Sequence, residues 1–94
     1  MSFAKWSSPA RADFRKLFLW LSQFDPAIAD RNAGSILAKA DWLSSHPHAG
    51  SPLDTLDWRK TVVAGTRYIV LYRPTADGVE ILRVHHSAEN WREG

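Results

Sequence analysis

Apolar residues in the first half of the chain recur at the spacing of amphipathic helices. The stretch "SSPARADFRKLFLWLSQF" opens with Ser8 as a candidate N-cap and Pro9 at the first helical position. The apolar positions that follow, three and four residues apart, form one helix face: Phe14, Leu17, Phe18, Leu21 and Phe24. This spacing predicts a helix that buries one side against the rest of the molecule.

A second helix is predicted where Asp25-Pro26 repeats the combination of cap and proline. It continues through "AIADRNAGSILAKADWLSSH", and Pro47 and Gly50 end it. Its apolar face consists of Ala29, Ala33, Ile36, Leu37, Ala40 and Leu43. Because the connection between the two helices is so short, we expect them to lie antiparallel as a hairpin.

The second half of the chain changes to the pattern of β-strands after a polar loop at residues 46–57. Three runs rich in β-branched and aromatic residues follow, "WRKTVVA", "TRYIVLYR" and "GVEILRVHH". Their short connections predict an antiparallel meander, and "FAKW" at residues 3–6 predicts a short additional strand. The expected fold class is therefore α+β, with a two-helix antiparallel hairpin packed on an antiparallel sheet.

Alternation along the last run divides its side chains between two faces of the sheet. The expected faces are Leu82, Val84 and His86 on one side and Ile81, Arg83 and His85 on the other. At most one histidine should then share a surface with Arg83, and on strand geometry it is His85. Both could do so only if the strand ends or bulges at this pair.

The composition limits the class of protein. The 94 residues, 45% of them hydrophobic, predict a single globular domain over residues 1–94 with a modest core. The absence of cysteine excludes disulfides and thiolate metal sites. No apolar run approaches the roughly 20 residues that span a bilayer, and no signal peptide is visible, so we expect a cytoplasmic protein without membrane contact.

Charge is unevenly distributed along the chain, although the net charge is only +2. Residues 58–86 carry Arg59, Lys60, Arg67, Arg73 and Arg83 against Asp77 and Glu80. This part could attract nucleic acid or an acidic protein surface, or its arginines could be ordinary solvated residues of strand edges.

Histidines offer the main candidate chemistry. The spacing of His46, His48, His85 and His86 does not predict convergent metal ligands, so we expect neither a metal nor a cofactor. Acid–base cleavage of RNA needs only a base, an acid and a cation, which His85 or His86 could supply with Arg59, Arg67 or Arg83. Alternatively, Arg83 pairs with a carboxylate such as Glu80 or Glu89, and one histidine caps the sheet.

Two of the five tryptophans, Trp20 and Trp42, fall away from the apolar faces of their helices. We expect them to be partly exposed. They could contact a protein partner, where exposed aromatic residues are favoured, or close the edges of a small core.

Together these segments resemble the RelE/ParE superfamily of toxins from bacterial toxin-antitoxin pairs. The resemblance covers nearly the whole chain, and its most specific parts are "YIVLYR" and, after a tight turn, "EILRVHH". In the ParE-type ending an arginine and a histidine flank a valine and a large apolar residue. His85 stands here in place of that apolar residue, and His86 is the better match to the family histidine.

The resemblance implies a toxin that a cognate antitoxin neutralises in a hetero-oligomer, with a segment of the antitoxin wrapped over the hairpin and sheet. Trp20 and Trp42 are the candidate antitoxin contacts. A ParE-like toxin inhibits DNA gyrase without catalytic residues, and the candidate target contacts are Arg59, Arg67, Arg83, His86 and Trp91. A RelE-like toxin cuts mRNA on the ribosome, and its candidate catalytic residues here are Arg59, Arg83, His85 and His86.

Departures from the RelE pattern favour the ParE-like branch. Ile69 stands where RelE-type nucleases commonly have an arginine, and only Arg59 and Lys60 supply the basic cluster of the first meander strand. Trp91 and Arg92 replace the usual catalytic tyrosine or final histidine-tyrosine pair. A third alternative is a non-toxic protein that only binds its antitoxin.

Overall fold

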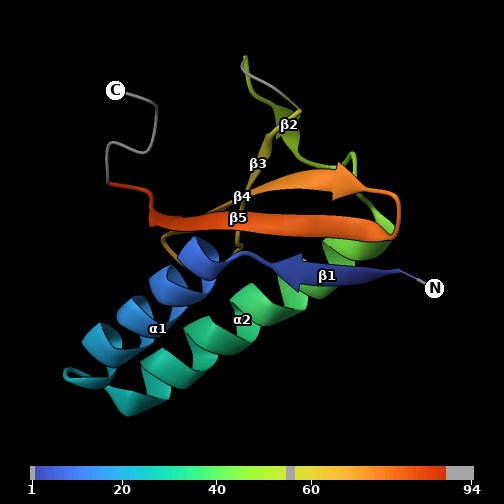
Figure 1. Cartoon of the computed structure of the whole chain (residues 1–94). Helices are drawn as coiled ribbons and strands as arrows, with labels where there is room; N and C mark the ends of the chain where they lie inside the picture. The colour runs from blue at the N-terminus through green and yellow to red at the C-terminus, as the bar shows by residue number, and fades with distance from the viewer. Residues whose placement is uncertain (1, 55–56, 89–94) are drawn as a thin grey trace.

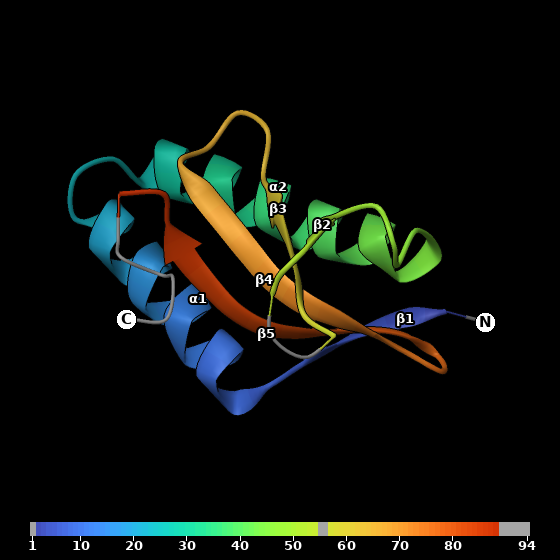
Figure 2. The same cartoon turned by 90° about the horizontal axis from the view of Figure 1, so that it is seen from above.

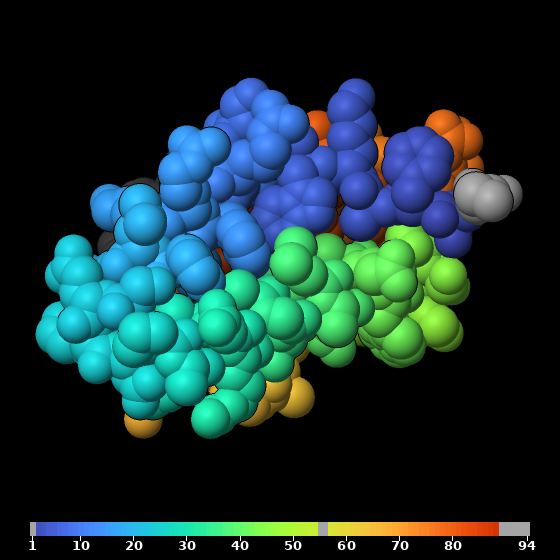
Figure 3. Space-filling view, turned by 90° about the horizontal axis from the view of Figure 1, so that it is seen from below, coloured from blue at the N-terminus to red at the C-terminus, as the bar shows by residue number. Residues whose placement is uncertain are grey.

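The computed structural model describes residues 2–54 and 57–88, which form two helices and five strands. In chain order these are β1 Phe3–Trp6, α1 Ser8–Ser22, α2 Pro26–Ser45, β2 Ser51–Pro52, β3 Arg59–Val62, β4 Tyr68–Thr75 and β5 Gly78–His86. The helices form an antiparallel hairpin that covers one face of the sheet (Figure 1). Seen from that side, α1 and α2 lie next to each other over most of the face (Figure 3). The predicted α+β class is confirmed.

Both helices begin at the predicted cap-and-proline pairs, with a shift of one residue at α1. Ser7, and not Ser8, is the N-cap, because its Oγ accepts a hydrogen bond of 3.1 Å from the N–H of Ala10. Asp25 caps α2 as predicted and accepts from the N–H groups of Ala27 and Ile28. The N-caps therefore set where each arm of the hairpin starts.

The sheet is mixed, with the strand order β1-β5-β4-β3-β2, and the strands twist across the hairpin (Figure 2). The antiparallel meander β3-β4-β5 is as predicted. The first strand differs from the expected antiparallel sheet because β1 runs parallel to β5. More than seventy residues connect these two strands, so no tight turn dictates their relative direction. The strand β2, at the opposite edge, lies within the segment that the sequence marked as a loop.

The core lies between the hairpin and the sheet, centred on β4. Residues Tyr68 to Tyr72 are all buried, as the apolar pattern on both faces of this central strand predicted. The buried cluster comprises Ala10, Leu17, Ile36, Ala40, Leu43, Val63, Tyr68, Val70, Tyr72, Val79, Ile81 and Val84. Within the described part of the chain, neither helix is long and apolar enough to cross a membrane.

A β-bulge in β5 changes the expected division of its side chains. Leu71 pairs with Arg83 and Tyr72 pairs with Ile81, so Leu82 has no partner on β4. Because the extra residue reverses the alternation, Ile81 and Val84 both belong to the core, instead of lying on opposite faces as predicted. The irregularity precedes the histidine pair by three residues and determines which way that pair projects.

Candidate functional site

Beyond the end of β1, the start of α1 takes over the hydrogen bonding along the edge of β5. The backbone N–H of Ser7 donates to the carbonyl of Ile81 at 2.9 Å, and the Ser7 hydroxyl donates to Leu82 O at 3.0 Å. Further along, the carboxylate of Asp13 accepts the backbone N–H of Val84 at 3.0 Å. These contacts hold α1 against the last residues of β5. They satisfy backbone N–H and C=O groups that would be unpaired at a free strand edge.

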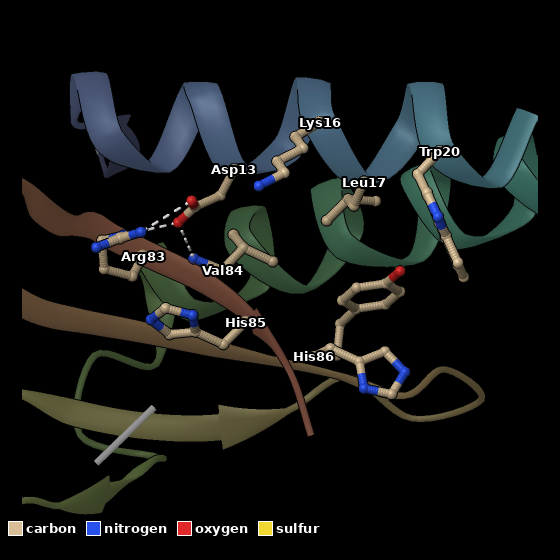
Figure 4. Close-up of a pocket in the computed structure, with 9 residues that line it drawn as sticks. Asp13, Lys16, Leu17, Trp20, Arg83, Val84, His85 and His86 are labelled. Atoms are coloured by element: carbon tan, nitrogen blue, oxygen red, sulfur yellow. Dashed lines mark hydrogen bonds and ion pairs between the residues drawn. The ribbon is translucent and has the colours of Figure 1, made fainter. Parts of the chain in front are cut away.

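Asp13 also binds Arg83 through two parallel hydrogen bonds (Figure 4). Arg83 Nε lies 2.7 Å from Oδ2 and Nη2 lies 3.0 Å from Oδ1, the bidentate geometry that a guanidinium favours. The Asp13 side chain is 17% exposed and that of Arg83 is 42% exposed. The ion pair therefore lies at the rim of the core, with the carboxylate on the buried side.

Glu80 and Glu89 were the expected carboxylate partners of Arg83. The prediction of Glu80 is wrong. Glu80 pairs with Arg73 at 2.9 Å, because the two residues lie directly opposite each other on β5 and β4. Glu89 lies outside the described residues. The sequence analysis did not name Asp13 as a partner. Its position, three residues after the buried Ala10 and four before the buried Leu17, places this acidic residue on the buried side of α1 and was the available signal.

The environment of Asp13 stabilises its charged form. Burial acts to raise the pKa of the carboxyl group, but the hydrogen bonds from Arg83 and from the Val84 N–H act against burial. The positive charges of Arg83 and His85 add to their effect, and the pKa of Asp13 lies below its ordinary value. Asp13 is thus a permanent counter-ion to Arg83 at neutral pH.

An open cleft of about 470 Å³ lies between α1 and the end of β5. Its walls are formed by Asp13, Lys16, Leu17, Trp20, Tyr68, Arg83, Val84, His85 and His86 (Figure 4). Both histidines therefore share this surface with Arg83, whereas at most one was expected to do so. His86 lies across from Tyr68 with the rings edge to face at 5.4 Å. The strand ends at His86, so the side chains of the pair can line one cleft from two directions.

Arg59 does not join this cleft. It pairs with Tyr72 on β4, and its Nη1 donates to the carbonyl oxygens of His48 at 3.2 Å and Gly50 at 2.7 Å. By register, Lys60 and not Arg59 lies in the cross-strand row of Leu71 and Arg83. Adjacent residues of a strand project to opposite faces, so the four residues of the nuclease hypothesis are not all brought together.

The remaining predicted contacts are spread over the surface. Arg67 is exposed in the connection between β3 and β4, and Trp91 lies outside the described residues. Trp20 and Trp42 are 54% and 44% exposed, which confirms the expected exposure. Trp20 packs against Phe24 at the hairpin tip, whereas Trp42 stacks on His46 at the far end of α2, a helix roughly 30 Å long. The two tryptophans therefore belong to separate surfaces.

A family model described as the ParE toxin of the type II toxin-antitoxin system parDE matches residues 4–91. The chain belongs to this ParE toxin family. It is also 36% identical over 81 residues to the protein named Toxin RelE3 from Caulobacter vibrioides, covering 85% of this chain and 88% of that relative. The predicted RelE/ParE resemblance is confirmed.

Solved structures with the same fold include complexes of both branches. A chain of the chromosomal ParDE TA system from P. aeruginosa superposes with a TM-score of 0.76 at 20% identity, covering 92% of this chain and 96% of that one. A chain of the toxin-antitoxin complex RelBE2 from Mycobacterium tuberculosis gives 0.67 at 28% identity, covering 90% and 96%. Membership of the family identifies this chain as a type II toxin. Both ParE and RelE names occur among the similar proteins, so these names do not identify the cellular target of this toxin.

Proposed function

We propose that this ParE-family toxin acts by binding DNA gyrase and not by cutting RNA. The observation that carries the proposal is the bidentate pair between Asp13 and Arg83. A nuclease that works without a metal needs a cation aimed at the phosphate as negative charge develops there. Of the candidate arginines only Arg83 lines the cleft together with both histidines, and its guanidinium is already bound to a carboxylate that stays charged at neutral pH.

The arrangement of the other candidates also supports a binding role. Arg59 is held by loop carbonyls, and it cannot replace Arg83 without breaking two hydrogen bonds. By contrast, the cleft between α1 and β5 offers an aromatic wall, two histidines and a rim of basic side chains, a composition that suits contact with a protein surface. We assign gyrase contact to this surface, with Arg83 and His86 as its polar residues, and extend it to the exposed Arg67 in the connection between β3 and β4, which lines a second depression together with His86.

The proposal includes an antitoxin and an intracellular site of action. The 28% identical RelBE2 chain comes from a toxin-antitoxin complex, which supports a protein antitoxin as the partner of this chain. Antitoxin and toxin then form a hetero-oligomer in the cytoplasm, where gyrase works.

Purified toxin tests the proposal directly. We expect it to inhibit gyrase supercoiling or trap cleaved DNA, and to leave ribosome-bound mRNA intact. Arg67→Ala should weaken the inhibition, whereas Arg15→Ala, which changes an exposed arginine of α1 outside the cleft, should retain it. Codon-dependent cleavage of translated mRNA, abolished by His86→Ala, would contradict the gyrase proposal.

A second candidate function is RNA cleavage, because the register places Lys60, Arg83 and His85 on one face of the sheet. Lys60 was not among the predicted catalytic residues, and it would take the role that Arg59 cannot fill. This alternative predicts that His85→Ala and Lys60→Ala each abolish cleavage of ribosome-bound mRNA. Normal growth after induced expression of the toxin alone, despite soluble accumulation, would argue against both toxic activities and favour a protein that only binds its antitoxin.

A further inference from the structure

The outward side of α2 differs from the polar surface that a solvated helix normally presents. Figure 3 shows α2 uncovered on the side that faces away from the sheet. The residues of this side recur at alternating spacings of four and three, and all of them are exposed: Ala27, Arg31, Gly34, Ala38, Asp41 and Ser45. We call this set the outer face of α2. Only Arg31 and Asp41 on it are charged, and the other residues are small.

Large apolar side chains border the outer face on both sides. By the helical period, Leu37 lies on one border, and Ile28 and Trp42 lie on the other. Their exposed fractions are 49%, 40% and 44%. The Trp42 ring stacks on that of His46 with 4.1 Å between centroids, and Lys39 Nζ lies 4.6 Å from its centre, so these contacts hold the indole in place. Small residues between exposed apolar side chains suit the packing of a second helix along α2.

Gly34 has no evident role within its own chain. It lies in the interior of α2, where glycine costs about 1 kcal/mol relative to alanine. Its φ is not positive, and a Cβ at this position would meet no neighbouring part of the chain within 4 Å. Without a side chain, however, Gly34 allows the backbone of another helix to approach closely. The glycine therefore indicates a partner outside this chain.

We propose that the outer face of α2 binds the same face of a second copy of this chain, with the two helices antiparallel. A two-fold axis level with Ile36 brings together residues that lie equally far before and after it in the sequence. Arg31 of one copy then meets Asp41 of the other, and Gly34 meets Ala38. Each of these contacts occurs twice, because the interface is formed by the same surface on both copies.

Charge selects a second copy in this direction as the occupant. Arg31 and Asp41 are ten residues apart, about 15 Å along the helix, so they do not pair within one chain. Neither takes part in an ion pair within the described residues. Antiparallel pairing satisfies both charges, whereas parallel pairing would place like charges opposite each other. On the borders, antiparallel pairing brings Leu37 beside its own counterpart and Ile28 beside Trp42.

The proposal goes beyond the proposed function and does not depend on it. Of the described residues that line the cleft between α1 and β5, none belongs to α2. The outer face is therefore separate from that cleft, which we assigned to the target. Because a single pair of helices forms a small interface, we expect weak self-association, with a Kd on the order of 10 µM.

Charge-reversed variants of the full-length toxin test the antiparallel register. Arg31→Asp and Asp41→Arg each place like charges opposite each other in a homodimer, so we expect each to weaken self-association at least about tenfold in sedimentation equilibrium. Mixing the two variants should restore association to about the wild-type level, because each substituted residue then meets an opposite charge on the other copy. The control Arg15→Asp makes the same change at an exposed position of α1 and should stay within about twofold of wild type.

Gly34→Gln tests the close approach of the helices without a cost to the fold. Glutamine is a better helix former than glycine, and the position is open, so this variant should be at least as stable as wild type in urea unfolding. Its side chain should hold the two helices apart and abolish self-association. The control Ala12→Gln adds the same side chain at an exposed position of α1, and we expect it to associate as wild type does.

Three results would overturn the proposal. The first is wild-type toxin that stays monomeric at roughly 200 µM, about twentyfold above the expected Kd. The second is self-association that Gly34→Gln leaves unchanged, and the third is failure of the mixed charge variants to associate. If Gly34→Gln instead weakens only antitoxin binding, the occupant is the antitoxin and the proposal is wrong. Failure of gyrase inhibition contradicts the proposed function alone, since self-association is measured without gyrase.

Discussion

Removing the carboxylate of Asp13 should destabilise the toxin by a predictable amount. Asp13→Ala breaks the ion pair with Arg83 and leaves the N–H of Val84 without its acceptor. Because the Arg83 side chain is 42% exposed, solvent screens the pair, and we assign it about 1 kcal/mol. The lost acceptor at the strand edge adds about 1 kcal/mol. The total of about 2 kcal/mol should lower Tm by roughly 10 °C in a domain of this size.

Urea unfolding of four proteins separates the two contributions. The set is wild type, Asp13→Ala, Arg83→Ala and the double variant, and the double-mutant cycle should give a coupling energy of about 1 kcal/mol. Asp13→Asn is the matched control, since its amide oxygen can still accept from Val84 while the charge is lost. We expect this variant to lose only about half as much as Asp13→Ala. A coupling energy within about 0.3 kcal/mol of zero would refute the reasoning that the ion pair holds α1 to β5.

Three further predictions concern stability. Because the pKa of Asp13 is lowered in the folded state, its charge adds to the free energy of unfolding in full above the unfolded-state pKa of about 3.9. This stabilisation is lost as pH falls through the lower folded-state pKa. The urea unfolding curves of wild type and Asp13→Asn should therefore converge in acid. Gly78→Ala should lower the free energy of unfolding in urea by about 2 kcal/mol or more, because φ is +144° and a Cβ would overlap the backbone of β1. Its control is Gly34→Ala, in open space within α2, which should instead stabilise the protein by about 1 kcal/mol. Tyr72→Phe should cost about 1–2 kcal/mol by thermal melting, since it leaves the buried N–H of Gly50 without its 2.8 Å acceptor, and unchanged stability would contradict that bond.

The candidate site was only partly predictable from the chain. Arg83, His85 and His86 were recognised because they are adjacent in the sequence, and the structure brings them to one cleft. Asp13 was missed because its partner lies 70 residues away, so only the packing of α1 on β5 shows that they meet. Arg59 was grouped with them because of its charge, and the pairing register separates it from them. Residue type identified candidates, whereas register and packing determined which of them share a surface.

The sequence by itself determined the local architecture of this protein. The local signals are a cap-and-proline pair at the start of each helix, the helical spacing of apolar residues and the runs of β-branched residues. They act between near neighbours and specify a hairpin and a meander without reference to the rest of the chain, although the cap of α1 is Ser7 and not the predicted Ser8. The tertiary structure alone decided the parallel direction of β1, the bulge at Leu82 and the cleft between α1 and the end of β5. These features depend on contacts between segments far apart in sequence, where many pairings satisfy the same local pattern and only the packed core selects one.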